Sequence, residues 1–444
     1  MKMRLRKYHI PLFIRFEVII CLVGLAFPIY GFPIAGAFKL TVFRIGLPLL
    51  LVAALSKGRR IKSHYARYLL VLASILAALT FISLAWSQFP NRGIQQLEWF
   101  AEGWLYLWAL GLLSSKYPSL PRFYLKCTFA IGLVSIGFMA AQFIALQFHR
   151  LITLPLSDSI FGISTILRPW TYPLGGGGRI LGAFYEPNMS GSMCAFYLAA
   201  FGPFLLANRQ GAVIRRFWTV IAVIVAAVAM IGTGSRQSMV VTGATMLLIV
   251  AIALRRGGHV LRRGARQALA IVTFLLLVYM AFGGFQATTT PFGELEQNVF
   301  VRFAESAGFS TGGRWDAILL VLRALTPRIV LFGAGAGTAD FTAHNAYLLT
   351  LYQSGILALL VLIGLSAVFI LASLHATWRQ KDNPLFYAGV ASTCIAATWV
   401  GLIFMNWAQL NQSVSYMYLA IPLLFLTASR EESEEDPQDL LGSR

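Results

Sequence analysis

Long runs of apolar residues, separated by short polar or glycine-rich stretches, fill most of the chain. A transmembrane helix needs roughly 20 mostly apolar residues, and on that rule the pattern predicts about twelve such helices. Their centres lie near residues 23, 47, 76, 106, 135, 198, 224, 246, 276, 360, 396 and 420. We therefore expect an all-α polytopic membrane protein.

Basic residues gather in every second connection between these runs, at 2–7, 57–62, 116–126, 209–216, 255–266 and 379–381. Because positively charged connections stay in the cytoplasm, both termini are predicted to be cytoplasmic. Residues 1–285 then hold transmembrane helices 1 to 9 with an outer loop near 149–187. A large helical outer loop at 286–343 separates helices 9 and 10, residues 344–430 hold helices 10 to 12, and 431–444 form an acidic cytoplasmic tail.

Composition supports the membrane interpretation, because 58% hydrophobic and 12% charged residues exclude an ordinary soluble globular protein. The net charge of +19 does not indicate a nucleic-acid partner, since membrane topology explains the short basic clusters. All four cysteines fall inside apolar runs, so we expect free thiols instead of disulfides or metal ligands.

The large outer loop contains apolar residues at helical spacing, namely Trp315, Ile318, Leu319, Leu322 and Leu325. This pattern predicts a short interfacial helix that lies on the bilayer and ends at Pro327. A glycine-rich turn, Gly-Ala-Gly-Ala-Gly at 333–337, follows it.

The predicted topology leaves only His149 and His344 of the six histidines on the outer face. His344 follows the glycine-rich turn, with Thr342 as a candidate N-cap of the next helix. A neutral imidazole at that position can accept a proton from an attacking hydroxyl. The alternative is a histidine that only binds loop carbonyls.

The segment GTGSRQS, residues 232–238, predicts a tight turn near the outer interface. Ser235 can cap the following helix, which would place Arg236 at a helix N-terminus that favours an anion. The alternative is an arginine that snorkels to lipid headgroups.

Arg179 follows four glycines and Arg314 follows two, on the same predicted face as Arg236. Guanidinium groups from several turns suit a diphosphate, because each presents a fork of donors to phosphate oxygens. Alternatively, each arginine forms a loop salt bridge with an acid such as Glu186 or Asp316.

Charged residues also occur at membrane depth: Lys39 and Arg44 near the second predicted helix, and Glu98 and Glu102 on one face of the fourth. Such charges usually pair with one another or line a cavity. We expect a structural network between the basic and acidic groups, with a polar substrate vestibule as the alternative.

The outer loops contain no Asp-x-Asp pair or His/Glu cluster, so we expect neither a metal nor another cofactor. A transporter or flippase for an anionic lipid remains an alternative of another class, in which the same arginines line a path. Transporters often show internal repeats, and we find no self-similarity between the halves of this chain.

Three segments, HNAYLLTLYQSG at 344–355, GTGSRQS at 232–238 and GAFYEPN at 182–188, resemble the O-antigen ligase family, whose relatives include O-antigen polymerases and pilin oligosaccharyltransferases. The family's histidine pattern is matched through Gly355, although Ala358 stands at its last position. Its Arg-x-x-x-Leu pattern is matched at Arg236, except that Val240 replaces the leucine.

The resemblance implies a metal-independent glycosyltransferase on the periplasmic side of a Gram-negative inner membrane. Such an enzyme moves a preassembled O-antigen glycan from undecaprenyl diphosphate to the lipid A core. O-antigen polymerase and protein O-oligosaccharyltransferase are the alternatives within the same superfamily. The sequence does not indicate an oligomeric state.

The resemblance also assigns roles to the candidate residues. Catalytic roles would belong to the arginines that neutralise the diphosphate and to the histidine that deprotonates the acceptor hydroxyl for an inverting displacement, namely Arg179, Arg236, Arg314 and His344. Substrate binding is expected at Lys39, Arg44, Glu186, Asn188, Asn345 and Tyr347.

Overall fold

The computed structural model describes residues 9–28, 31–35, 38–147, 180, 182, 184, 187–206, 214–256, 314–338, 345–380, 386–405 and 413–428. Within these residues the helices are α1 (Leu12–Ala26), α2 (Val42–Lys57), α3 (His64–Ser83), α4 (Pro90–Ser114), α5 (Leu120–Gln147), α6 (Pro187–Phe201), α7 (Arg216–Thr233), α8 (Arg236–Arg256), α11 (Arg314–Ala324), α12 (Pro327–Phe332), α13 (Ala346–Arg379), α14 (Phe386–Met405) and α15 (Ser413–Ala428). Short 3-10 helices, η2 (Leu84–Trp86) and η4 (Gly202–Leu206), extend α3 and α6.

Six of the described helices are long and apolar enough to cross a membrane, which indicates a multi-pass membrane protein. They are α3 with η2, α5, α6 with η4, α7, α13 and α14. Every predicted span centre falls inside a described helix except the one near residue 276, which lies outside the described residues. The number of twelve transmembrane helices and the outer position of the large loop stay predictions.

A small β-hairpin departs from the all-helical expectation. Strands β1 (Gly31–Ala35) and β2 (Phe38–Thr41) pair antiparallel between α1 and α2, with Pro33 opposite Lys39. Glycine and proline in this stretch disfavour a helix, and pairing of the two strands satisfies backbone groups that a helix would otherwise satisfy internally. Helix α2 begins directly after β2, where the Thr41 hydroxyl accepts a hydrogen bond from the Arg44 backbone N–H.

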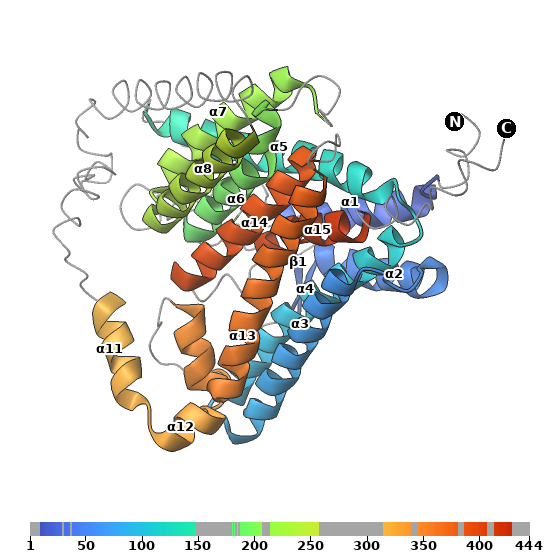
Figure 1. The fold of residues 1–444 in the computed structure, drawn as a ribbon. Helices are drawn as coiled ribbons and strands as arrows, with labels where there is room; N and C mark the ends of the chain where they lie inside the picture. Colours follow the sequence, from blue (N-terminus) through green and yellow to red (C-terminus); the bar gives the residue numbers. More distant parts are fainter. Residues whose placement is uncertain are drawn as a thin grey trace.

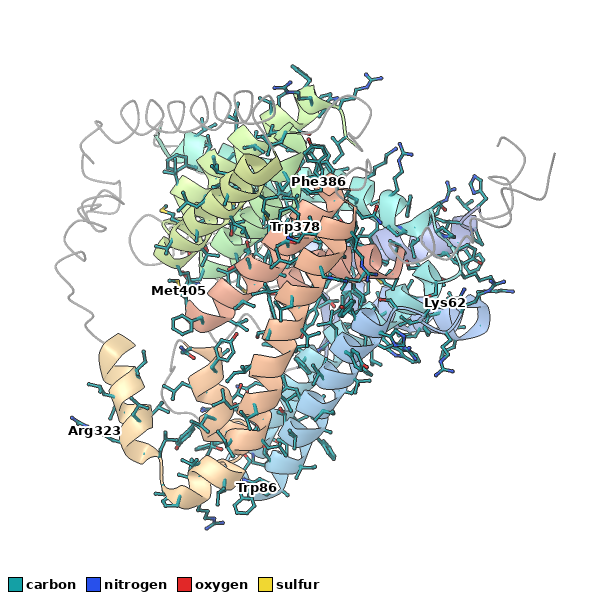
Figure 2. The ribbon with its side chains drawn as sticks, viewed as in Figure 1. Lys62, Trp86, Arg323, Trp378, Phe386 and Met405 are labelled. Atoms are coloured by element: carbon teal, nitrogen blue, oxygen red, sulfur yellow. The ribbon has the colours of Figure 1, made fainter. Side chains whose placement is uncertain are left out.

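Helices α1 to α4 form one group and α5 to α8 another, with α13, α14 and α15 between them (Figure 1). Figure 2 shows Lys62, Trp378 and Phe386 toward one end of the molecule, which we call the Lys62 end. Trp86, Arg323 and Met405 lie toward the opposite end, which we call the Trp86 end (Figure 2).

Helix α13 reverses its direction at Gly355. The backbone there has φ 83° and ψ −179°, which no α-helix contains. The hydroxyls of Tyr347 and Ser366 lie 2.8 Å apart, although a straight helix would separate residues 19 apart by about 28 Å. We call residues 346–354 the short arm and residues 356–379 the long arm. The span predicted near residue 360 therefore corresponds to the long arm, and residues 346–354 do not continue it in a straight line.

The long arm runs antiparallel to α3, beside which it lies in Figure 1. At the Lys62 end, the rings of Tyr65 and His375 meet edge to face at 5.7 Å. At the other end, the hydroxyls of Ser83 and Ser354 lie 3.4 Å apart. The reversal at Gly355 consequently sits at the Trp86 end, and the short arm turns back from there toward the middle of the molecule.

Candidate functional site

Two of the sequence motifs meet at the N-termini of α6 and α8. The backbone N–H of Ile180 donates to the carbonyl of Gly232 at 3.0 Å, and the Ser235 hydroxyl donates to Asn188 Oδ1 at 3.4 Å. Gly191 allows this approach, because a Cβ there would lie only 2.5 Å from the Cβ of Ser235. The fold therefore brings GAFYEPN and GTGSRQS together, although about 50 residues separate them in the chain.

The predicted helix start at Arg236 is confirmed. Helix α7 ends at Gly234 in the left-handed conformation, with φ 57°, and α8 begins at Arg236. Ser235 is the N-cap residue, since its carbonyl accepts the first bond of α8 from Met239 at 3.1 Å. The free N–H groups and the dipole of α8 thus point toward the region of Asn188.

The glycine-rich turn at 333–337 fixes the reversal of α13. Its three glycines have positive φ angles of 80°, 101° and 84°, which other residues rarely adopt. The N–H groups of Ala334 and Gly335 donate to the carbonyls of Tyr352 and Gln353 at 2.7 and 3.0 Å. These bonds cap the C-terminal end of the short arm, whose carbonyls would otherwise lack partners within the helix.

The turn is also anchored on the end of α3. The Trp86 indole Nε1 donates to the carbonyl of Gly333 at 3.2 Å, and the backbone N–H of Ala336 donates to the Ser83 hydroxyl at 3.2 Å. Together with the backbone bonds, these contacts fix where the short arm starts and ends.

The short arm begins two residues after the start of the histidine motif. Asn345 is its N-cap, with the side-chain Oδ1 accepting from the Leu348 N–H at 2.9 Å. The prediction of Thr342 as the cap is wrong, because α13 starts only at Ala346. The half-buried Tyr347 bonds to Ser366 of the long arm, and its ring lies 6.4 Å from that of Phe404 in α14.

A cavity of about 910 Å³ lies between the short arm, the long arm, α8, α11 and α14. Its walls are mostly apolar, with four polar side chains among them: Asn345, Tyr347, Ser366 and Thr245. Val240 and Val241 contribute from α8, Ile318 and Leu322 from α11, and Phe404 and Met405 from α14. Two of the three motifs, GTGSRQS and HNAYLLTLYQSG, thus lead into helices that border the cavity, namely α8 and α13, whereas α6, which follows GAFYEPN, contributes no lining residue.

The interfacial helix predicted in the large loop is present as α11, which ends before Pro327. Pro327 does more than end the preceding helical segment. It is the first residue of α12, and Thr326 is the N-cap of that helix. Val321 is buried against Leu349 and Tyr352 of the short arm, while Ile318 and Leu322 line the cavity. The position of α11 on a bilayer stays a prediction.

Several predicted site residues fall outside the described residues, namely Arg179, Glu186 and His344. Arg314 and Arg236 are the first residues of α11 and α8, and Lys39 lies in β2. Of these three residues the structure describes only the backbone. His344 directly precedes Asn345 in the sequence, and Asn345 lines the cavity.

Arg44 forms the expected charge network. Its Nη2 lies 2.9 Å from Glu98 Oε1, and its Nε lies 2.7 Å from Glu102 Oε1. The Arg44 side chain is 11% exposed, whereas those of Glu98 and Glu102 are 32% and 21% exposed, so the arginine is the more buried partner. This geometry favours a structural role for Arg44, which joins α2 to α4, over the alternative of a substrate-binding residue in a polar vestibule.

Sequence reasoning missed Ser366, Thr245 and Phe404 as residues of the cavity. No local motif marks them, because they reach the cavity only through the reversal of α13 and the packing of α14 on α8.

Neither the protein-family models nor the curated proteins with which the chain was compared give a match.

Proposed function

We propose that the chain is an O-antigen ligase, which transfers a preassembled glycan from undecaprenyl diphosphate to the lipid A core on the periplasmic face of a Gram-negative inner membrane. The observation that carries this proposal is the cavity of about 910 Å³, because it lies between α8 and α11, which begin at Arg236 and Arg314, and is lined by Asn345, the residue after His344. Its apolar walls suit a polyprenyl chain, and its polar side chains can form hydrogen bonds with a diphosphate or a sugar.

The chemistry is a single displacement at the anomeric carbon. His344 accepts the proton of the acceptor hydroxyl, and the oxygen attacks the anomeric carbon while the bond to the diphosphate breaks. The diphosphate leaves with the bonding electrons, and Arg236, Arg179 and Arg314 neutralise it together with the N-terminus of α8. Inversion at the anomeric carbon follows from one displacement.

Replacement of His344 tests this mechanism. In a ligase-null strain, the His344→Ala variant should give lipopolysaccharide without its high-molecular-weight ladder, because the acceptor hydroxyl keeps its proton. The loss of rate expected for a missing general base is about 10²- to 10⁴-fold. His375→Ala is the matched control, since His375 lies at the Lys62 end of α13 and does not line the cavity, so this variant should leave the ladder intact. A normal ladder from His344→Ala at wild-type protein levels would refute the catalytic role.

The related polymerase and protein O-oligosaccharyltransferase functions differ in the acceptor. Purified protein supplied only with lipid-linked donor should stay inert if it is a ligase, and should form longer lipid-linked glycan if it is a polymerase. Glycosylation of an added pilin-like protein would instead indicate the oligosaccharyltransferase.

One structural observation favours the flippase alternative, because transporters often bind substrate at broken helices and α13 is broken at Gly355. Vesicles containing the protein and a fluorescent lipid diphosphate separate the two functions. A flippase moves the lipid between leaflets without acceptor, whereas a ligase does not.

A further inference from the structure

Gln237 is a buried amide that has no hydrogen-bond partner within the described part of the chain. Its side chain is 3% exposed, and both Nε2 and Oε1 are left without a bond. Leaving a buried polar group unsatisfied costs about 1–3 kcal/mol, so native proteins retain such groups rarely and for a reason. A group in this state inside a binding region is ready to bond to a ligand.

The position of Gln237 in α8 relates it to the cavity. Residues four apart lie on one face of a helix, and Val241, one turn after Gln237, lines the cavity. Thr245, one turn further, also lines it and bonds to Thr398 of α14 at 2.9 Å. Gln237 therefore lies on the same face of α8 as these two lining residues, one turn closer to the helix N-terminus and next to the lined part of the cavity.

That end of the wall already favours an anion. The N-termini of α6 and α8 meet there through the bond between Ser235 and Asn188, and Ser235 also lies 2.9 Å from Ser238 through their hydroxyls. Two positive helix ends at one place attract a phosphate group. Gln237 lies in the first turn of α8, where its amide can contact a group attached to a phosphate that binds at these helix ends.

The chemistry of the amide narrows the ligand further. A glutamine offers donors on Nε2 and an acceptor on Oε1, whereas the oxygens of an ionised diphosphate only accept. A bare diphosphate would leave Oε1 unsatisfied. Both groups are satisfied only if the ligand adds a hydroxyl or an N–H beside the phosphate, as a sugar does.

We propose that Gln237 is a specificity-determining residue that binds the sugar joined directly to the diphosphate of the lipid-linked donor. This inference rests on the proposed transferase function. The helix N-termini and the arginines bind the phosphates of any lipid diphosphate, and the amide adds affinity only when the first sugar is present. A site that bonds to a polar substituent in this way discriminates against ligands lacking it.

Binding measurements with two probes test the proposal without depending on transfer. The probes are undecaprenyl diphosphate and undecaprenyl diphosphate carrying one N-acetylglucosamine, bound to purified full-length protein. Wild-type protein should bind the sugar-bearing lipid about tenfold more tightly, as expected for one or two added hydrogen bonds. Gln237→Leu should bind both lipids equally, at the affinity that wild type has for the bare lipid.

Thr242→Val is the matched control, because the Thr242 hydroxyl is also buried in α8 without a partner among the described residues, but five residues further along the helix. This variant should keep the tenfold preference. Both variants should unfold at or above the wild-type temperature without ligand, since each removes an unsatisfied polar group. A lower unfolding temperature for Gln237→Leu would mean that its amide stabilises the fold, which contradicts the proposal.

The outcomes distinguish a failure of the Gln237 inference from a failure of the proposed transferase function. If wild-type protein prefers the sugar-bearing lipid and Gln237→Leu keeps that preference, the amide binds only water and the inference is wrong. If wild-type protein binds neither lipid, the proposed transferase function fails and the inference fails with it.

Discussion

Arg44 illustrates how one side chain can be committed to structure at a depth where charge is costly. Its guanidinium faces Glu98 and Glu102, which are one turn apart on α4. Two nitrogens of the guanidinium, Nη2 and Nε, contact carboxylates of α4, which argues for a bracing role between α2 and α4.

Removal of Arg44 alone should destabilise the protein. Arg44→Met leaves two partly buried carboxylates side by side, and we expect a loss of about 2–3 kcal/mol, below the range for fully buried pairs because both acids retain some exposure. The triple variant Arg44→Met, Glu98→Gln, Glu102→Gln should regain most of that loss. Thermal unfolding in detergent measures both effects.

Donor affinity in the triple variant decides between the two roles of Arg44. If the role is structural, the triple variant binds undecaprenyl diphosphate like wild type. A well-folded triple variant that has lost this affinity would show that Arg44 binds substrate after all.

At the scale of single residues, the sequence indicated where helices begin and end more accurately than which side chains contact one another. The turn before Arg236 follows from Gly234 and Ser235, whose local preferences suffice to end one helix and begin another. The bond between Tyr347 and Ser366 could not be predicted, because it depends on a reversal of direction between them. The same holds for Gln237, whose lack of partners is a property of the packed structure.

At the scale of elements, α13 shows a limit of apolar periodicity. The residues on both sides of Gly355 are apolar, and Gly364 further along the same helix has a similar sequence environment. Yet the helix reverses at Gly355 and continues straight through Gly364. The difference comes from the surroundings, because the turn at 333–337 binds the short arm by its backbone, and no hydropathy pattern encodes that contact.

Alanine substitutions at these two glycines should therefore have opposite effects. At Gly355 the left-handed backbone is strained for alanine, and the new Cβ would collide with the backbone carbonyl of Leu331, which cannot move aside cheaply. We expect Gly355→Ala to cost more than about 2 kcal/mol of stability.

Gly364→Ala is the control, since nothing lies within 4 Å of a Cβ at that position. It should be neutral or stabilise the helix by about 0.5–1 kcal/mol. Thermal unfolding of the two purified variants checks both expectations, and equal stability would contradict the described backbone at Gly355.

At the scale of the whole molecule, the two ends should face opposite sides of the membrane. We expect the Trp86 end, including exposed Arg328 of α12, to face the periplasm, and exposed Lys62 to face the cytoplasm. The test uses a variant without the native free thiols, which the structure describes at Cys21, Cys127, Cys194 and Cys394.

Single cysteines at the two positions, Arg328→Cys and Lys62→Cys, should then react differently with a maleimide that cannot cross the inner membrane. In intact spheroplasts only Arg328→Cys should be labelled, and Lys62→Cys should require permeabilised cells. The reverse pattern would place the cavity on the cytoplasmic side and exclude the proposed ligase.

The global architecture was predictable as far as apolar length determines it. Helices occur at the predicted centres within the described residues, because each run is long enough to form one and because a helix satisfies its own backbone in an apolar environment. The β-hairpin before α2 and the cavity beside α13 were not predictable, since both depend on which segments meet in space.

The contacts at the reversal also constrain the order in which the chain assembles. Ser83 is 253 residues from Ala336 and 271 from Ser354, so α3 leaves the ribosome long before its partners are synthesised. The short arm has only about two and a half turns and cannot enter a bilayer as a span by itself. It therefore settles into place only after the long arm has been inserted, and the cavity is complete once α14 has joined them.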